Sequence, residues 1–466
     1  MPLGTPERPV RVAVIGAGPA GFFTADALLR SESPLFDVDV LERLPTPFGL
    51  VRAGVAPDHQ KIKAVTKTFE RTAQNQRFRF LGNVEVGRDI SASELSRHYD
   101  QVVYAVGSSS DRRLGIPGEE LGGSHSATAF VGWYNAHPDF RDFPFDLSVE
   151  RAAIVGVGNV AMDIARVLLK DPEELGKTDI ARHALEALRS SRVREVVLLA
   201  RRSPAHAAFD PRELEDIAAL PGVRVELDPA RVAADARDTE HLDSRQQRNL
   251  EVMLGLARKE HEPAERVLRL EFSASPVELL PDPRGRVRAL RVERNESVRG
   301  PDGRAVARGT GQFFELEAGL VFRSIGYLGL PLPGVPYDAD SGVIPNRDGR
   351  VTTERNGQVI PGVYAVGWIR RGPLGVIGTN KADAQLVAKS MLEDVRTLAG
   401  AAPELRTHQA VDETLAKHGV KVTSYDDWMH IDLVELDEGR ATGKLREKFA
   451  SVEEMMNQLL KKQAEG

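Results

Sequence analysis

Two glycine-rich stretches, each directly after a short apolar run, constrain the fold more than any other feature of this 466-residue sequence. The first, VRVAVIGAGPAGFF, begins at Val10, and the second, AAIVGVGNVAMDIA, spans 152–165. In each, a buried-strand pattern precedes the glycines, a helical pattern follows them, and a further apolar strand comes next. This order is typical of the β-α-β unit that binds the diphosphate of a dinucleotide. The sequence therefore predicts two nucleotide-binding units in one chain.

The first loop reads G-A-G-P-A-G, with Gly16, Gly18 and Gly21 at the three glycine positions of the dinucleotide fingerprint. The first glycine permits a tight turn, the second lets the diphosphate approach the backbone, and the third allows helix and strand to pack closely. Glu42 ends the next strand, where a carboxylate accepts a hydrogen bond from a ribose hydroxyl. The alternative interpretation is a plain turn followed by a surface glutamate.

The second loop, G-V-G-N-V-A, places Gly156, Gly158 and Ala161 at the same positions. After the helix and a helical insert, the strand VVLLA ends in Arg201 and Arg202, where an NAD site would carry an acid. Two guanidiniums there match the 2′-phosphate of NADP, whereas the alternative is a solvated basic strand end. One loop followed by an acid and one followed by arginines together predict a chain that binds FAD and NADPH.

Composition narrows the chemistry further. Lys and Arg total 62 and Asp and Glu total 68, for a formal charge of -6, which argues against nucleic acid or an anionic membrane as the main partner. The chain has no cysteine, so thiolate metal sites, cysteine-ligated clusters and a catalytic thiol pair are excluded. No metal site is predicted, and redox chemistry must come from a bound cofactor. Without a secretion signal or an apolar run of about 18 residues, we expect a cytoplasmic protein with no integral membrane segment, and nothing demands more than a monomer.

Several longer motifs follow one another along the chain: PTPFGLVRAGVAPDHQKIK, FVGWYNAHP, GNVAMDIARVLL, RRSP and GWIRRGPLGVIGTNKADA. Together they resemble the adrenodoxin-reductase type of ferredoxin-NADP reductase, bacterial members included, over nearly the whole chain. The resemblance implies an α/β fold with two Rossmann-like dinucleotide-binding domains of three ββα layers, the NADPH domain being inserted into the FAD domain. The expected limits are 1–108 and 328–466 for the FAD-binding domain and 109–327 for the NADPH-binding domain.

The resemblance also implies site residues beyond the two loops. His59 and Glu213 match a pair that tunes the flavin site in that family, and we take them as candidate catalytic residues; by residue type alone they are a loop histidine and a helix-face acid. Trp368 would cover the flavin or the nicotinamide, although most tryptophans in this setting are core residues. The implied FAD contacts are Ala20, Glu42, Leu50, Val86, Trp368, Gly375, Val376 and Ile377. The implied NADPH contacts are Arg112, Gly158, Asn159, Val160, Arg201, Arg202, Glu213 and Gly375.

The activity implied is hydride transfer from NADPH to FAD, followed by single-electron delivery to an acidic, ferredoxin-like iron-sulfur protein. Such a partner requires a basic landing surface, and two groups of cations are candidates, with solvated helix faces as the alternative. Another flavoenzyme, either a quinone reductase or a monooxygenase, and a non-catalytic nucleotide-binding redox sensor remain open. The first candidate group is Lys63, Lys67 and Arg71, expected on one helical face; the second is Arg189, Arg192 and Arg194, expected beside the NADP arginines.

Overall fold

The first unit of the fold is a largely parallel sheet that begins with the N-terminal apolar run. The computed structural model describes residues 2–237, 239–240, 242–259, 263–299, 305–398 and 403–465. Strand β1 (Val10–Ile15) is buried throughout, as expected for a central parallel strand covered on both faces. It lies between β4 (Gln101–Tyr104) and β2 (Phe36–Glu42), in the strand order β16-β17-β18-β4-β1-β2-β3. The others are β3 (Phe78–Gly82), β16 (Asn346–Arg347), β17 (Arg350–Thr352) and β18 (Val359–Ala365). The β16–β17 and β17–β18 pairs are antiparallel, and the other strand pairs of this sheet are parallel.

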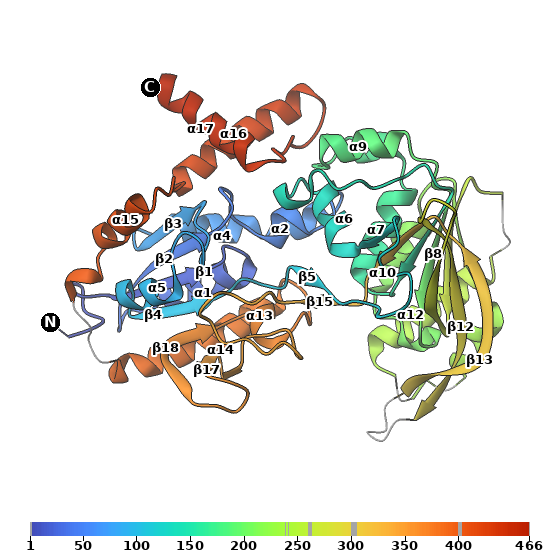
Figure 1. The fold of residues 1–466 in the computed structure, drawn as a ribbon, viewed down its shortest axis with the longest axis horizontal. Coiled ribbons are helices and arrows are strands. Elements are labelled where there is room, and N and C mark those ends of the chain that lie inside the picture. The colour runs from blue at the N-terminus through green and yellow to red at the C-terminus, as the bar shows by residue number, and fades with distance from the viewer. Residues whose placement is uncertain are drawn as a thin grey trace.

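Helices cover both faces of this sheet. Val12 and Val14 of β1 point to one core, which they share with α1 (Pro19–Leu29), α4 (Thr66–Ala73) and α14 (Thr379–Asp394). Ala13 and Ile15 point to the other, which includes side chains of α5 (Ala92–His98) and α15 (His408–Lys417). Helices α1 and α14 pack against each other, so two glycine-bearing segments far apart in sequence lie side by side (Figure 1).

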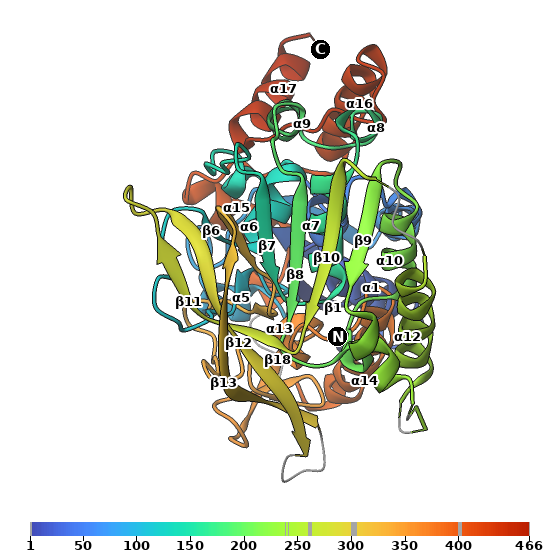
Figure 2. The same cartoon turned by 90° about the vertical axis from the view of Figure 1, so that its right-hand side faces the viewer.

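The second unit has three layers around a six-stranded, fully parallel sheet. The strand order of this sheet is β6-β14-β7-β8-β10-β9, and successive residues of β7, such as Ile154 and Val155, face opposite cores. Helices cover one face and an antiparallel sheet covers the other (Figure 2). The parallel strands are β6 (Ser124–Ser126), β7 (Arg151–Val155), β8 (Glu195–Ala200), β9 (Val223–Leu227), β10 (Arg266–Phe272) and β14 (Leu320–Arg323). The antiparallel strands are β11 (Ala274–Pro281), β12 (Val287–Arg299) and β13 (Ala305–Glu317); the helices are α6 (Ala127–Tyr134), α7 (Asn159–Leu169), α9 (Arg182–Arg189), α10 (Pro211–Ala218) and α12 (Ser244–Ala257).

The chain leaves and re-enters the first unit through two short strands that lie together. Strand β5 (Ser110–Asp111) pairs antiparallel with β15 (Tyr327–Leu328), between the two sheets (Figure 1). Two further helices, α16 (Tyr425–Ala441) and α17 (Val452–Glu465), end the chain. Among the described helices, none has the length and apolar character needed to cross a membrane. The short helices are α2 (Leu50–Ala53), α3 (Gln60–Lys63), α8 (Pro172–Leu175), α11 (Pro229–Asp235) and α13 (Trp368–Arg371).

One sequence-based expectation fails at this level. The segment expected to present Lys63, Lys67 and Arg71 on one helical face is two helices, since α3 ends at Lys63 and α4 begins at Thr66. The β-branched residues around the break, including Val65 and Thr66, favour helix less than straight-chain residues. Lys63 is 9% exposed and binds a buried aspartate, so it is not part of a basic landing surface.

Candidate functional site

The first glycine loop lies between β1 and α1, and its three glycines are required for three different reasons. Gly16 has a φ of 106°, and a Cβ atom there would lie 2.7 Å from the Ala105 carbonyl oxygen. A Cβ at Gly21 would lie 2.1 Å from the Gly16 oxygen, so this glycine allows α1 to pack on β1. Gly18 is different, because a Cβ there would meet no atom within 4 Å. The loop is thus tight on its inner side and open at Gly18, the residue that precedes the first turn of α1.

Glu42 holds its carboxylate beside this loop. Its Oε2 accepts a hydrogen bond of 2.9 Å from the Ala17 N–H, and its Oε1 accepts one of 3.2 Å from Leu44. Burial raises the pKa of Glu42, while the backbone donors act in the opposite direction. The Val84 N–H donates to the Glu42 carbonyl at 2.9 Å, which places the segment containing Val86 at the same strand end. The Val86 side chain is buried, so this residue offers mainly its backbone to a ligand.

Residues from distant parts of the sequence converge on the open side of the first loop. A Cβ at Gly49 would lie 3.0 Å from the Gly18 Cα, which brings α2 and the partly exposed Leu50 to the loop. A Cβ at Gly367 would lie 2.6 Å from the Ala20 Cβ, which brings Trp368 to the first turn of α1.

The residues after β18 carry features that fit an aromatic cofactor. The indole Nε1 of Trp368 is buried without a hydrogen-bond partner among the described residues, and its ring lies 5.5 Å from that of Tyr327. Next along the chain, Leu374 and Val376 are 70% and 60% exposed, with Gly375 between them at a φ of 84°. An unpaired donor and exposed apolar side chains in one segment fit a ring system with both polar and apolar edges. Ile377, which follows, is half-buried and packs against the core of the first unit.

The second glycine loop repeats the same geometry between β7 and α7. Gly156 has a φ of 126°, and a Cβ there would lie 2.1 Å from the Ser324 oxygen. A Cβ at Gly158 would again meet no atom within 4 Å, and the methyl group of Ala161 is fully buried where the first loop has its third glycine. The Asn159 side-chain oxygen accepts a hydrogen bond of 2.7 Å from the Asp210 N–H. The loop is therefore tied to the start of α10, and Val160 follows as a partly buried residue of α7.

Arg201 and Arg202 follow β8 and have features expected of an anion site. Arg201 is exposed, Arg202 is partly buried, and in the described parts of the chain neither forms an ion pair. Burial and the neighbouring Arg201 charge lower the pKa of Arg202. Arg112 is also exposed, and its N–H donates to the Gly326 oxygen at 3.1 Å, on the connection between the two units.

The second expected landing surface is wrong in its location. Arg189, Arg192 and Arg194 precede β8, whereas the NADP arginines follow it. A six-residue strand separates the two groups by about 20 Å, since each residue of a strand rises roughly 3.3 Å. Arg189 is paired with Glu173 at 3.0 Å, and Arg192 lies 3.5 Å from Glu150. Residues before and after β8 are close in sequence but lie at opposite ends of the strand.

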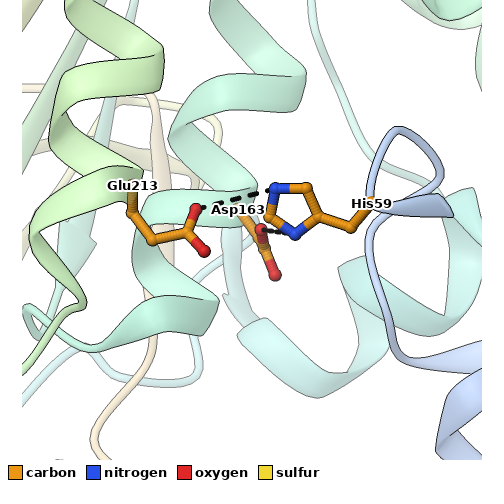
Figure 3. A group of neighbouring side chains, drawn as sticks. All are labelled: His59, Asp163 and Glu213. Atoms are coloured by element: carbon orange, nitrogen blue, oxygen red, sulfur yellow. Dashed lines mark ion pairs between the residues drawn. The ribbon is translucent and has the colours of Figure 1, made fainter. Parts of the chain in front are cut away.

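Between the two loops, His59 meets two carboxylates from the second unit (Figure 3). The His59 Nδ1 lies 3.6 Å from the Asp163 Oδ1, and its Nε2 lies 3.9 Å from the Glu213 Oε2. Asp163 belongs to α7 and Glu213 to α10, so the expected pair of His59 and Glu213 is brought together at the contact between the two units. Both distances exceed hydrogen-bond length, and the imidazole lies between the carboxylates without a direct bond to either.

A buried arginine binds both of these carboxylates. Arg166 donates to the Asp163 Oδ1 at 2.6 Å and to the Glu213 Oε2 at 2.6 Å. It also donates to both oxygens of Asp58, at 3.0 and 3.1 Å, and Lys170 donates to Asp58 at 2.9 Å. The three groups His59, Asp163 and Glu213 are spaced closely enough to suggest a metal site, but Arg166 already donates to one oxygen of each carboxylate. The guanidinium thus supplies positive charge to both carboxylates.

The electrostatics of this centre favour the uncharged forms of Glu213, Asp163 and His59 but the charged form of Asp58. Burial and the Asp163 carboxylate raise the pKa of Glu213 to about 7. Burial also raises the pKa of Asp163, and burial together with the Arg166 charge lowers the pKa of His59. Burial acts to raise the pKa of Asp58, but Arg166 and Lys170 hold it well below its usual range. A pKa of about 7 means that the protonation of Glu213 changes near neutral pH.

Sequence reasoning did not single out Asp58, Asp163 or Arg166. The sequence does contain a signal for Asp163 and Arg166. They are three residues apart on one helix that begins at the second glycine loop, and opposite charges at this spacing lie next to each other. Asp58 directly precedes His59 in APDHQ. The contact of these residues with Glu213, however, depends on where α10 lies.

Comparison with known proteins shows close relatives along the whole chain. A profile of the Pyridine nucleotide-disulphide oxidoreductase family matches residues 10–254. The NADPH-ferredoxin reductase FprA of Mycobacterium tuberculosis is 46% identical over 459 residues, which cover 96% of this chain and 99% of the relative. The mitochondrial NADPH:adrenodoxin oxidoreductase of Homo sapiens is 43% identical, with 98% of this chain and 93% of the relative covered.

A solved structure agrees with these sequence relatives. The Mycobacterium tuberculosis FprA structure in complex with NADPH superposes with a TM-score of 0.92 at 45% identity and covers 97% of this chain and 99% of that chain. The similarity includes both sheets and their connections, which confirms the predicted α/β class with two Rossmann-like sheets. The chain belongs to the pyridine nucleotide-disulphide oxidoreductase family, and within it to the group of NADPH-ferredoxin and NADPH:adrenodoxin reductases.

Proposed function

We propose that this protein is an FAD-dependent NADPH:ferredoxin reductase. The observation that carries the proposal is the pair of glycine loops in one chain, each open at its middle glycine. One loop lies beside Glu42, and the other lies near two arginines that form no ion pair with any residue that the structure describes. The names of the close relatives point to the same activity. A disulphide reductase, which the family name also includes, would need a cysteine pair, and this sequence has no cysteine.

The proposal assigns one cofactor to each unit. Residues 1–108 and 328–466 would form the FAD-binding domain, and residues 109–327 the NADPH-binding domain. Sheet membership supports these limits, since every strand of the second and third sheets falls within 124–317 or 320–323, and the paired strands β5 and β15 lie at the two crossings. The backbone at Gly18 and at the start of α1 would hold the FAD diphosphate, and Gly158 with α7 would hold that of NADPH.

The cofactors, when bound, supply the chemistry: a hydride passes from the nicotinamide to the flavin, and the two electrons leave singly to an iron-sulfur protein. The chain's own residues position and shield the two rings. Leu50, Trp368 and Val376 would exclude water from the flavin, and Arg201 and Arg202 would select the 2′-phosphate. His59 and Glu213 would set the charge and proton state beside the rings, with Arg166 holding Glu213 in place.

The experiment that tests the function is anaerobic titration of the purified yellow protein with NADPH. Flavin absorbance should bleach with NADPH and much less with NADH, and the reduced protein should then reduce a ferredoxin faster than a quinone or oxygen. Fast reoxidation by quinone or oxygen with slow ferredoxin reduction would instead indicate a quinone reductase or a monooxygenase. Flavin that binds but is not reduced would indicate a redox sensor, and a protein that binds no flavin would contradict the proposal.

The raised pKa of Glu213 gives a pH-dependent prediction. Above about pH 7 Glu213 is ionised, and a negative charge beside the proposed NADPH site would favour hydride donation, which leaves the nicotinamide ring positively charged. The rate of flavin reduction at saturating NADPH should therefore rise several-fold as pH increases through 7. Stopped-flow measurements should show no such rise in Glu213→Gln. Glu215→Gln, which changes an exposed acid of the same helix paired with Arg248, is the matched control and should keep the wild-type profile.

The partner, quaternary state and location complete the proposal. An acidic iron-sulfur protein of the ferredoxin type is the partner that the relatives' names suggest. Action as a monomer and a cytoplasmic location stay predictions, which light scattering coupled to gel filtration and cell fractionation would test.

A further inference from the structure

The loop between α16 and α17 lies in the contact between the two units. We call residues 444–450 of this loop the C-terminal clamp; Figure 1 shows this end of the chain in red, reaching toward α9. The Lys448 side chain is 1% exposed, and its Nζ donates to the Arg52 carbonyl at 3.2 Å and to the Asn135 Oδ1 at 3.3 Å. It lies 3.4 Å from Asp179, which also binds the Lys63 Nζ at 2.6 and 2.8 Å. One buried carboxylate of the second unit is thus held by two buried lysines of the first unit.

Further buried polar contacts complete the clamp. The Lys444 Nζ donates to the Ile180 carbonyl at 2.6 Å and to Glu447 at 2.9 Å. On the other side, the fully buried Glu435 binds Arg52 and Arg446 and accepts a hydrogen bond of 3.0 Å from the backbone of residue 449. Burying this many charges costs free energy unless each charge has its partner. The network therefore holds only in one arrangement of the segment with α2 and α3, the segment around Asp179 and the C-terminal clamp.

The clamp acts on the elements that carry the proposed flavin residues. Arg52 lies in α2, two residues after Leu50, and Lys63 lies in α3, four residues after His59. Asp179 lies two residues before Ala181, whose N–H donates to the Tyr134 carbonyl at 2.9 Å. A change at Asp179 would therefore be transmitted to α2 and α3 through directional bonds.

We propose that the C-terminal clamp sets the distance between the two nucleotide sites, with Asp179 and Lys448 as positioning residues for hydride transfer. This inference rests on the proposed reductase function. Hydride transfer needs the donor carbon of the nicotinamide and the acceptor nitrogen of the flavin in close contact. A misplacement of about 1 Å lowers the rate by up to a hundredfold. Buried ion pairs suit this role, because they specify one register, whereas an apolar contact tolerates sliding.

The test is Asp179→Asn in the FAD-loaded protein. Flavin reduction at saturating NADPH should slow by on the order of tenfold to a hundredfold. The dissociation constant for NADPH and the rate of reduction by dithionite should stay near wild type, because both glycine loops are intact. A second readout needs no turnover: without NADPH, amide hydrogen exchange in α2 and α3 should accelerate. Asp179→Glu, which keeps the charge, should restore much of the rate.

The same network supplies a control variant, a replacement variant and the result that would contradict the proposal. Glu173→Gln breaks an exposed ion pair with Arg189 and should change neither readout. If Asp179→Asn does not fold, Lys63→Met serves in its place, since Asp179 keeps Lys448 as a partner. A variant with a lower melting temperature but a wild-type saturating rate and unchanged exchange in α2 and α3 would overturn the proposal. If wild-type flavin is not reduced by NADPH, the reductase function fails, whereas the exchange measurement still decides whether the clamp holds α2 and α3.

Discussion

Gly18→Val should give a folded protein that no longer retains FAD, whereas Gly158→Val should retain FAD and lose reduction by NADPH. Both glycines have extended backbone angles, with φ of -81° and -99°, which valine adopts without strain. A Cβ at either position meets no protein atom within 4 Å, so the fold has room for the side chain. The added carbons fill the space through which a diphosphate reaches the backbone, and we expect each substitution to weaken its own nucleotide by on the order of a hundredfold or more, about 3 kcal/mol.

The two variants control for each other. Flavin content is measured from the visible spectrum after gel filtration, NADPH binding from anaerobic titration, and folding from thermal melting followed by circular dichroism. Gly21→Val would be a poor substitute, because its Cβ would clash with the Gly16 oxygen and unfold the loop for reasons unrelated to binding. Retention of stoichiometric FAD by Gly18→Val, or equal loss of FAD from both variants, would contradict the assignment of the loops.

Replacement of both Arg201 and Arg202 by alanine should raise the Michaelis constant for NADPH about a hundredfold, and each single replacement about tenfold. A charge-assisted hydrogen bond contributes roughly 1.5 to 3 kcal/mol, and each tenfold change in affinity corresponds to about 1.4 kcal/mol. Neither arginine forms an ion pair in the described parts of the chain, so the folded state loses no such contact. The constant for NADH, which lacks the 2′-phosphate, should change little.

The measurement is steady-state ferricyanide reduction with each cofactor. Arg189→Ala is the matched control, because it removes an exposed arginine at the opposite end of β8. A similar response of NADPH and NADH to the substitutions would show that the arginines do not contact the 2′-phosphate.

The two glycine loops could be predicted from the sequence because their physics is local. The close approach at Gly21 and the acid at Glu42 are set by residues within one β-α-β unit, where strand and helix are neighbours in the chain. Arg201 and Arg202 could be placed for the same reason, since they directly follow an apolar strand. The fold class follows from repetition of this pattern.

The two expected basic landing surfaces show the limit of the same reasoning, because the structure does not place their residues as expected. Sequence proximity to β8 grouped Arg189 with the NADP arginines, but a strand carries its two ends apart. Four-residue spacing grouped Lys63 with Lys67, but the helix breaks between them and Lys63 turns inward to Asp179, 116 residues away. A charged residue in a sequence does not show whether another segment of the chain pairs with it and buries it.

What the sequence by itself determined, then, are the two nucleotide loops and the absence of thiol chemistry, because each depends on residues adjacent in the chain or on composition. Only the tertiary structure decided that His59 lies between Asp163 and Glu213, that Arg166 binds both carboxylates, and that residues 444–450 reach the contact between the units. The contacts of His59 with the two carboxylates and of residues 444–450 with the second unit join segments more than 100 residues apart. Their geometry depends on how separately formed sheets and helices pack, which no local pattern encodes.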